Sequence, residues 1–187
     1  MKYTTSDIKN GLKILVDGDP CVILENEFEK PGKGQAFTRV KFRNYRTGKV
    51  LEKTYKSGQS LLPADIQEQK MTFLYPEGSL YNFMDPETFE QISIDEEAIG
   101  NNKQWMIEQN DYMVLLWNGA PISITPDNFL EIEVTYCEPG VKGDTVSGAM
   151  KTATLATGAT IKVPLFIKQG EIIKVDTRDG SYVSRVQ

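Results

Sequence analysis

The residues of this chain that are best suited to chemistry lie in one short segment, Glu29–Gln35, with the sequence EKPGKGQ. Pro31 fixes one backbone dihedral angle, while Gly32 and Gly34 permit backbone conformations that other residues avoid. The segment falls between two expected strands, so it predicts a narrow hairpin loop with Lys33 at its apex. Flanked by glycines, this lysine could enter a tight cleft or meet a modifying enzyme. Taken alone, the spacing favours an ordinary turn with an exposed lysine.

Several kinds of catalytic site are excluded by composition. The segment lacks the G-x-x-x-x-G-K-[ST] pattern of a phosphate-binding P-loop. The 187 residues include no histidine, which is the usual general base near neutral pH and the commonest metal ligand. This removes Ser-His-Asp and Cys-His catalysis and most zinc sites. An enzyme that uses carboxylates or lysine remains open.

Length and composition are typical of a globular protein of two or three small domains. Apolar residues make up 40% of the chain and charged residues 25%, with a net charge of −5. No apolar run approaches the roughly 20 residues that span a bilayer, and the N-terminus lacks the apolar core of a signal peptide. Cys21 and Cys137 are far apart in sequence, so we expect reduced, buried thiols and a cytoplasmic protein.

The elements that position the Lys33 loop are expected to be short strands. Apolar-rich runs alternate with Gly, Pro, Asn and Asp, a pattern typical of strands joined by turns. The expected strands are Gly11–Val16, Cys21–Glu25, Ala36–Asn44, Val50–Tyr55, Met71–Tyr75, Leu80–Met84, Tyr112–Trp117, Ile122–Ile124, Phe129–Tyr136, Thr152–Leu155, Thr160–Phe166, Glu171–Asp176 and Ser181–Val186.

Turns, loops and helical segments separate these strands. Asp17–Pro20, Pro76–Ser79 and Arg178–Gly180 predict hairpin turns, Glu138–Gly148 predicts a loop, and Asp95–Asn110 predicts short helical turns. The acids at Asp95-Glu96-Glu97 are best explained as a helix start, although an acid pair or a cation site is the alternative. We expect both tryptophans, Trp105 and Trp117, in the core.

The strand spacing divides the chain into three β-barrel modules, residues 1–63, 64–126 and 127–187. Their net charges differ, at +5, −9 and −1 respectively. A basic first module is the footprint expected for contact with phosphates, and a scattered solvated surface is the alternative. The acidic middle module is expected to repel nucleic acid, or to face a protein or a cation.

Two long motifs resemble one known family. KPGKGQAF at Lys30–Phe37 resembles the modification loop of bacterial translation elongation factor P, and KTATLATGATIKVPLFIKQG at Lys151–Gly170 is similar to that family's signature. Gly143-Asp144-Thr145, Trp117-Asn118-Gly119 and the ending VDTRDGSYVSR are similar too. At the loop apex, lysine is followed by Gly-Gln, unlike the histidine that follows it in hypusine-bearing relatives. The resemblance covers the whole chain.

The resemblance implies a fold and a function. The fold is all-β, with an SH3-like (KOW-type) domain followed by two OB-fold domains in an elongated, L-shaped, tRNA-like arrangement. The function is to bind both ribosomal subunits between the P and E sites and to help peptidyl-tRNA react at consecutive prolines. Lys33 would receive a β-lysyl group from a dedicated ligase. The ribosome performs the chemistry, so we expect a monomer without catalytic residues, metal or cofactor.

The resemblance also suggests the residues that contact RNA. In the first module, Lys30, Arg39, Lys41 and Arg43 would bind the RNA backbone, and strand alternation puts the last three on one face. Gly143, Asp144 and Thr145 would lie in a loop near the small subunit. Tyr182 and Arg185 would reach the anticodon stem-loop of the peptidyl-tRNA. Without the resemblance, we would expect these lysine and arginine side chains only to form a solvated strand face, and Tyr182 to pack on the face of a barrel.

Three alternatives stay open at this stage. The nearest is a paralogue that resembles elongation factor P. The second is a general binder of single-stranded nucleic acid built from OB barrels, against which the net charge of −10 over residues 64–187 argues. The third is a hydrolase that uses a carboxylate pair in the acidic middle module, for which the sequence suggests no substrate.

Overall fold

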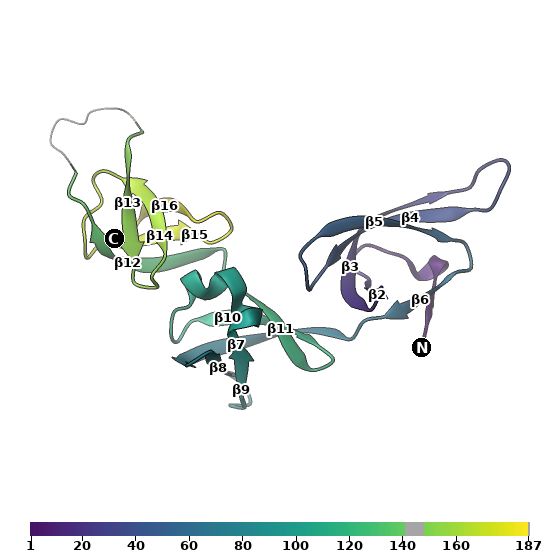
Figure 1. The fold of residues 1–187 in the computed structure, drawn as a ribbon, viewed down its shortest axis with the longest axis horizontal. Coiled ribbons are helices and arrows are strands. Elements are labelled where there is room, and N and C mark those ends of the chain that lie inside the picture. Colours follow the sequence, from purple (N-terminus) through teal and green to yellow (C-terminus); the bar gives the residue numbers. More distant parts are fainter. Residues whose placement is uncertain (141–147, 187) are drawn as a thin grey trace. The chain divides into compact units, whose positions relative to one another are not determined.

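The computed structural model describes residues 1–140 and 148–186, and strands dominate in these ranges. The strands form three antiparallel sheets, which Figure 1 shows in sequence colours. The prediction of a mostly β protein is therefore confirmed. No helix in the described ranges is long and apolar enough to cross a membrane.

The first sheet contains the Lys33 loop. Its strand order is β1-β6-β2-β3-β4-β5, and a short 3-10 helix, η1 (Thr5–Asp7), follows β1. The strands are β1 (Tyr3–Thr4), β2 (Lys13–Val16), β3 (Asp19–Glu29), β4 (Phe37–Asn44), β5 (Val50–Lys56) and β6 (Ser60–Pro63). Alternate residues of these strands form one core, which contains Ile14, Cys21, Ile23, Val40, Phe42, Tyr55 and Leu61.

The second sheet has the order β11-β10-β7-β8-β9. Its strands are β7 (Ile66–Glu77), β8 (Leu80–Met84), β9 (Gln91–Asp95), β10 (Asp111–Trp117) and β11 (Ala120–Thr125). Between β9 and β10 lie the helix α1 (Glu96–Ile99) and the 3-10 helix η2 (Gly100–Trp105). The expected helical turns are thus confirmed, and Asp95 caps α1 because its side chain accepts a hydrogen bond from the Glu97 backbone N–H.

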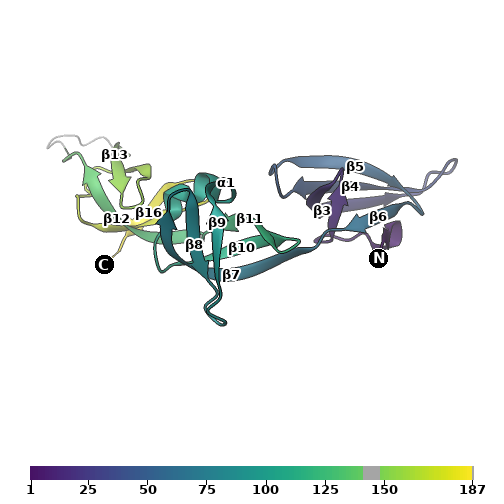
Figure 2. The same cartoon turned by 60° about the horizontal axis from the view of Figure 1, so that its bottom comes forward.

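The third sheet has the order β14-β13-β12-β15-β16. Its strands are β12 (Phe129–Cys137), β13 (Met150–Leu155), β14 (Thr160–Pro164), β15 (Ile172–Asp176) and β16 (Ser181–Arg185), and Figure 2 shows β12, β13 and β16 from a second side. The motif at Lys151–Gly170 contributes Ala153, Ile161, Val163 and Ile167 to the core of this sheet. Much of that motif therefore serves packing.

Packing divides the chain into two compact units, Met1–Gln69 with Leu115–Ser123, and Lys70–Val114 with Ile124–Gln187. In the second unit, the indole of Trp105 packs in the same buried cluster as Leu130 and Val175 of the third sheet. The Tyr112 hydroxyl donates to the Trp105 carbonyl (2.6 Å) and accepts from the Ile107 N–H (2.8 Å), which holds this segment in place. The boundaries at residues 63 and 126 stay a prediction.

Trp117 corrects one expectation. Trp105 is buried in the core as expected, but Trp117 is only half-buried. In the first unit, the Arg46 guanidinium lies 5.8 Å from the centroid of the Trp117 ring, and it also pairs with Asp19 at 3.0 Å. An indole at the end of a strand can bind a cation on its ring face instead of packing inside a barrel.

Most expected strands are confirmed, with different ends. The turn expected at Asp17–Pro20 contains only Asp17 and Gly18, which both have positive φ (51° and 84°), so Pro20 lies inside β3 and pairs with Leu15. Pro76 likewise lies inside β7. Three strands, β1, β6 and β9, were not predicted. β1 and β6 are short and lack apolar alternation, whereas β9 carries a signal that was missed, the alternation of Ile92 and Ile94 with polar residues.

The cysteines agree with expectation. Cys21 lies in β3 and Cys137 in β12, and both thiols are free and buried. Burial raises the pKa of the Cys21 thiol to about 11, and nearby Asp19 adds to this effect. A thiol in this state is protonated at neutral pH and acts as a small apolar core residue.

We predict that Trp105→Ala lowers the free energy of unfolding of the second unit by about 3–5 kcal/mol, because it leaves a large cavity in the buried cluster. Phe89→Ala in the same unit is the matched control, because the Phe89 side chain is 68% exposed, against 2% for Trp105. The control should change the free energy of unfolding by no more than about 0.5 kcal/mol. Urea unfolding measures both, and equal effects would contradict the packing described here.

Candidate functional site

The site is built on the β3–β4 hairpin of the first sheet. Figure 1 shows this hairpin extending past the rest of its sheet, with the connecting loop at its end. The pairing continues to Glu29 opposite Phe37, so the strands hold both ends of the Lys30–Ala36 connection. A long antiparallel pair positions its loop far better than a flexible linker does.

The two faces of β4 alternate in burial. Thr38, Val40, Phe42 and Asn44 are buried, whereas Arg39 and Arg43 are exposed and Lys41 is half-buried. Residues two apart on a strand share a face. The structure therefore places Arg39, Lys41 and Arg43 together on the outer face, as the sequence predicts.

A β-bulge in β3 decides what faces these bases. The pairing shifts at Leu24, between Ile23 opposite Phe42 and Glu25 opposite Lys41. The one extra residue moves the following side chains to the other face of the strand. As a result, Glu25, Glu27 and Glu29 lie on the outer face.

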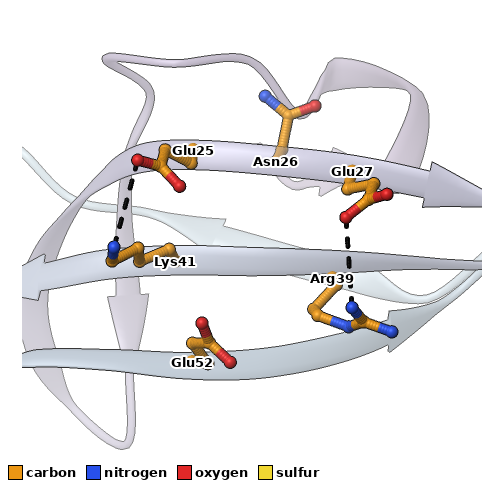
Figure 3. A pocket seen from close by; sticks show the side chains of 6 residues that line it. All are labelled: Glu25, Asn26, Glu27, Arg39, Lys41 and Glu52. Carbon is orange, nitrogen blue, oxygen red and sulfur yellow. Dashed lines mark ion pairs between the residues drawn. The ribbon is translucent and has the colours of Figure 1, made fainter.

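Three cross-strand ion pairs result, which we call the outer-face ladder (Glu25, Glu27, Glu29, Arg39 and Lys41). The Lys41 Nζ lies 3.9 Å from Glu25 Oε1. The Arg39 guanidinium lies 3.9 Å from Glu27 Oε2 and 3.3 Å from Glu29 Oε1. Figure 3 shows the Lys41–Glu25 and Arg39–Glu27 pairs side by side on neighbouring strands. The bases expected to bind phosphate therefore already have acidic partners.

Lys33 differs from Arg39 and Lys41 in that no acid in the described part of the chain pairs with it. Pro31, Gly32, Lys33, Gly34 and Gln35 are all exposed. Among the residues that the structure describes, the Lys33 ammonium has no hydrogen-bond or ion-pair partner. The hairpin loop thus presents a free cation to solvent.

The base of the loop is anchored while its apex is open. The Gln35 side-chain amide donates to the Ser57 carbonyl (3.2 Å), and the Ser57 N–H donates to the Ala36 carbonyl (3.0 Å). Gly34 has a φ of +110°, a backbone conformation that residues other than glycine rarely adopt. Gly32 has no such constraint, since its φ is not in the left-handed region and an added Cβ would meet nothing within 4 Å.

Two more groups lie beside the loop. The Lys30 side chain is exposed, next to the end of β3. Phe28 lies near the loop end of β3, opposite Thr38 and on the other face from the ladder. Its side chain is 62% exposed. The loop end of the hairpin therefore combines two cations with one exposed aromatic ring.

The C-terminal residues singled out by sequence, Tyr182 and Arg185, lie on one face of β16 but have different surroundings. Tyr182 is half-buried and packs against the core of the third sheet. Arg185 is exposed, pairs with Glu171, and lies 5.2 Å from the centroid of the Phe166 ring. A β-bulge at Val183 shifts the pairing, so that Tyr182 lies opposite Val175 and Arg185 opposite Ile173, which puts both on one face of β16. Gly143, Asp144 and Thr145 lie outside the described residues.

The acids form no evident metal site. Within residues 1–140 and 148–186, no group of three or more acidic or cysteine side chains is arranged to hold an ion. Asp95, at the centre of the expected acidic cluster, is used as the helix cap described above.

Comparison with known proteins covers almost the whole chain. Residues 4–61 match the elongation factor P KOW-like domain, residues 66–124 match its OB domain, and residues 130–185 match its C-terminal domain. The chain belongs to the elongation factor P family. The expected fold class, a KOW-like domain followed by two OB-type domains, is therefore confirmed.

Two solved structures are similar in fold to this member of the elongation factor P family. Eukaryotic translation initiation factor 5A from Methanococcus jannaschii has 23% identity and a TM-score of 0.53, over 67% of this chain and 92% of its own. A translation initiation factor eif-5a family protein from Naegleria fowleri has 15% identity and a TM-score of 0.52, over 67% of this chain and 97% of its own.

Family membership gives the function in outline. This elongation factor P family member is a translation elongation factor, and its partner is the ribosome. The family is one of translation factors. The part of the hairpin that sequence reasoning missed is the acidic half of the ladder. A signal existed, because Glu25, Glu27 and Glu29 alternate on one side of the loop as Arg39 and Lys41 do on the other.

The Arg185–Glu171 pair gives a prediction about pH. The Arg185 side chain, through its hydrogen bond, holds the pKa of Glu171 below its ordinary value. A lowered carboxyl pKa adds stability above the ordinary pKa of about 4.3, and this stability is lost as the pH falls through the folded-state pKa. We therefore expect Arg185→Met to raise the pKa of Glu171, and to destabilise the protein near pH 7 by an amount that decreases as the pH falls through the folded-state pKa of Glu171.

An NMR titration of the Glu171 carboxyl carbon measures this shift. Arg178→Met is the matched control, since Arg178 pairs with Asp176 instead. An unchanged Glu171 pKa in the Arg185 variant would contradict the assigned pair.

Proposed function

We propose that this protein binds the ribosome between the P and E sites and contacts the peptidyl-tRNA. There it stimulates peptide-bond formation when consecutive prolines stall the ribosome. The observation that carries the proposal is the free Lys33 ammonium at the apex of an anchored hairpin loop. Membership of the elongation factor P family supplies the partner. Such a factor acts as a monomer in the cytoplasm, where ribosomes translate.

Slow reaction of proline explains why a positioning factor helps. The proline nitrogen is a secondary amine in a constrained ring, so a poorly placed prolyl-tRNA and nascent chain react slowly. Holding the reacting groups in a near-attack arrangement lowers the entropic part of the barrier. A factor that only orients tRNA needs no catalytic residue and no cofactor of its own. The ribosome remains the catalyst.

Modification of Lys33 extends this role. A ligase would add a β-lysyl group to the Lys33 amine, which lengthens the arm and adds an ammonium near the 3′ end of the tRNA. The exposed apex and the small neighbours Gly32 and Gly34 support access by such an enzyme. Intact mass of the native protein, followed by peptide mapping, detects the added group.

The RNA contacts are proposed for residues of both ends of the chain. Lys30, Arg39, Lys41 and Arg43 would contact tRNA phosphates, and such contacts weaken as salt concentration rises. Arg39 and Lys41 must then exchange carboxylate partners for phosphate, because the ladder occupies them in the free protein. Tyr182 and Arg185 would contact the anticodon stem-loop from one face of β16, and Gly143, Asp144 and Thr145 would contact the small subunit.

We predict that Lys33→Ala lowers the yield of a polyproline-containing reporter roughly tenfold, because the arm that orients the tRNA is lost. A proline-free reporter should change little. Lys49→Ala is the matched control, since it removes the same charge from an exposed position between β4 and β5. Equal output from both reporters in the Lys33 variant would overturn the proposal.

The two glycines of the loop give a second prediction. Gly34→Ala should reduce polyproline reporter yield several-fold, because a side chain at φ +110° costs about 1–3 kcal/mol and distorts the apex. Gly32→Ala should stay within about twofold of the wild type, since its backbone tolerates a Cβ. The same reporter measures both variants. A Gly32 variant that is as defective as the Gly34 variant would show that loop geometry is not the cause.

A further inference from the structure

We propose that Glu25, Glu27 and Glu29 are specificity-determining residues that restrain the binding of RNA to the first sheet. In the free protein they occupy Arg39 and Lys41, so phosphates reach these bases only by displacing carboxylates. The inference rests on the proposed function for the choice of RNA as the ligand. Its test uses RNA binding without translation, so the two can fail separately.

The charge balance of the outer face supports this role. The first module has a net charge of +5, yet the outer face of β3, β4 and β5 is neutral. The side chains that the register of β3, β4 and β5 places on this face include the bases Arg39, Lys41, Arg43 and Lys56 and the acids Glu25, Glu27, Glu29 and Glu52. The excess positive charge therefore lies elsewhere, including Lys30 and Lys33 at the loop.

The geometry of the pairs makes them exchangeable. The distances are 3.3–3.9 Å, and the paired side chains are 38–73% exposed. Exposed ion pairs of this kind are each weak. An open depression of about 330 Å³ is lined by Glu25, Glu27, Arg39 and Lys41 together with Asn26 and Glu52, so a phosphate can approach the same cations from solvent (Figure 3).

Competition between the glutamates and phosphates for Arg39 and Lys41 most weakens the binding of RNA that is not also held at the Lys33 loop. A single phosphate gains little at Arg39, because it must displace two carboxylates that already pair with the guanidinium. The unpaired ammonium of Lys33 has no such competitor. Contacts at Arg39 and Lys41 therefore form readily only when the loop is already held against its target. The acids thus favour a correctly docked RNA over any available phosphate backbone.

The test compares two charge-matched triple variants of the full chain. The ladder variant is Glu25→Gln, Glu27→Gln and Glu29→Gln. The control is Glu87→Gln, Glu96→Gln and Glu97→Gln. It removes three exposed acids, one between β8 and β9 and two in α1. Both raise the net charge by the same amount. The readout is affinity for a short RNA duplex, measured over a range of salt concentrations.

We expect the ladder variant to bind the duplex about tenfold more tightly at low salt, with the slope of log affinity against log salt steeper by about two, one per freed cation. The control should change affinity by less than about twofold. If the triple variant does not fold, Glu29→Gln alone, which removes the nearer partner of Arg39, should still give about a twofold to threefold gain.

Two results would overturn the proposal. Equal gains in the ladder and control variants would show that only net charge matters. Unchanged RNA affinity, together with slower modification of Lys33 by its ligase, would show that the glutamates form a protein docking face instead.

Discussion

The pairing register of β3 with β4 is the constraint on which the candidate site depends. It buries Val40 and Phe42 on one side and exposes Arg39 and Lys41 on the other, and it holds both ends of the Lys33 loop. A shift by one residue would exchange the two faces. The bulge at Leu24 is such a shift, confined to one strand, and it sets glutamates opposite the bases without disturbing the core.

Electrostatics and backbone geometry then assign different roles to neighbouring cations. Among the described residues, Lys33 has no acidic partner, because it lies beyond the paired strands and its neighbours are glycines. Arg39 and Lys41, in contrast, form ion pairs with acids on the adjacent strand. The free cation can make the first contact, and the paired cations can add to it only at the cost of their own ion pairs. Binding strength and discrimination are therefore set by different residues of one hairpin.

Sequence predicted the parts of this structure that depend on local pattern. The alternation in Phe37–Asn44 gave the face of Arg39, and the Pro-Gly-Lys-Gly spacing gave the loop apex. The bulge at Leu24 could not be predicted, because an inserted residue does not change the composition of the strand. A bulge is visible only in how β3 pairs with β4. The half-buried Trp117 depends likewise on Arg46, which is distant in sequence. Positions that depend on pairing partners were missed for the same reason.

A cryo-EM map of the protein bound to a ribosome stalled at consecutive prolines tests the central claim most directly. The account predicts the Lys33 side chain beside the 3′ end of the peptidyl-tRNA, with Arg39 and Lys41 turned from their glutamates toward phosphates. A map in which the hairpin loop points into solvent and the outer-face ladder stays intact would contradict it.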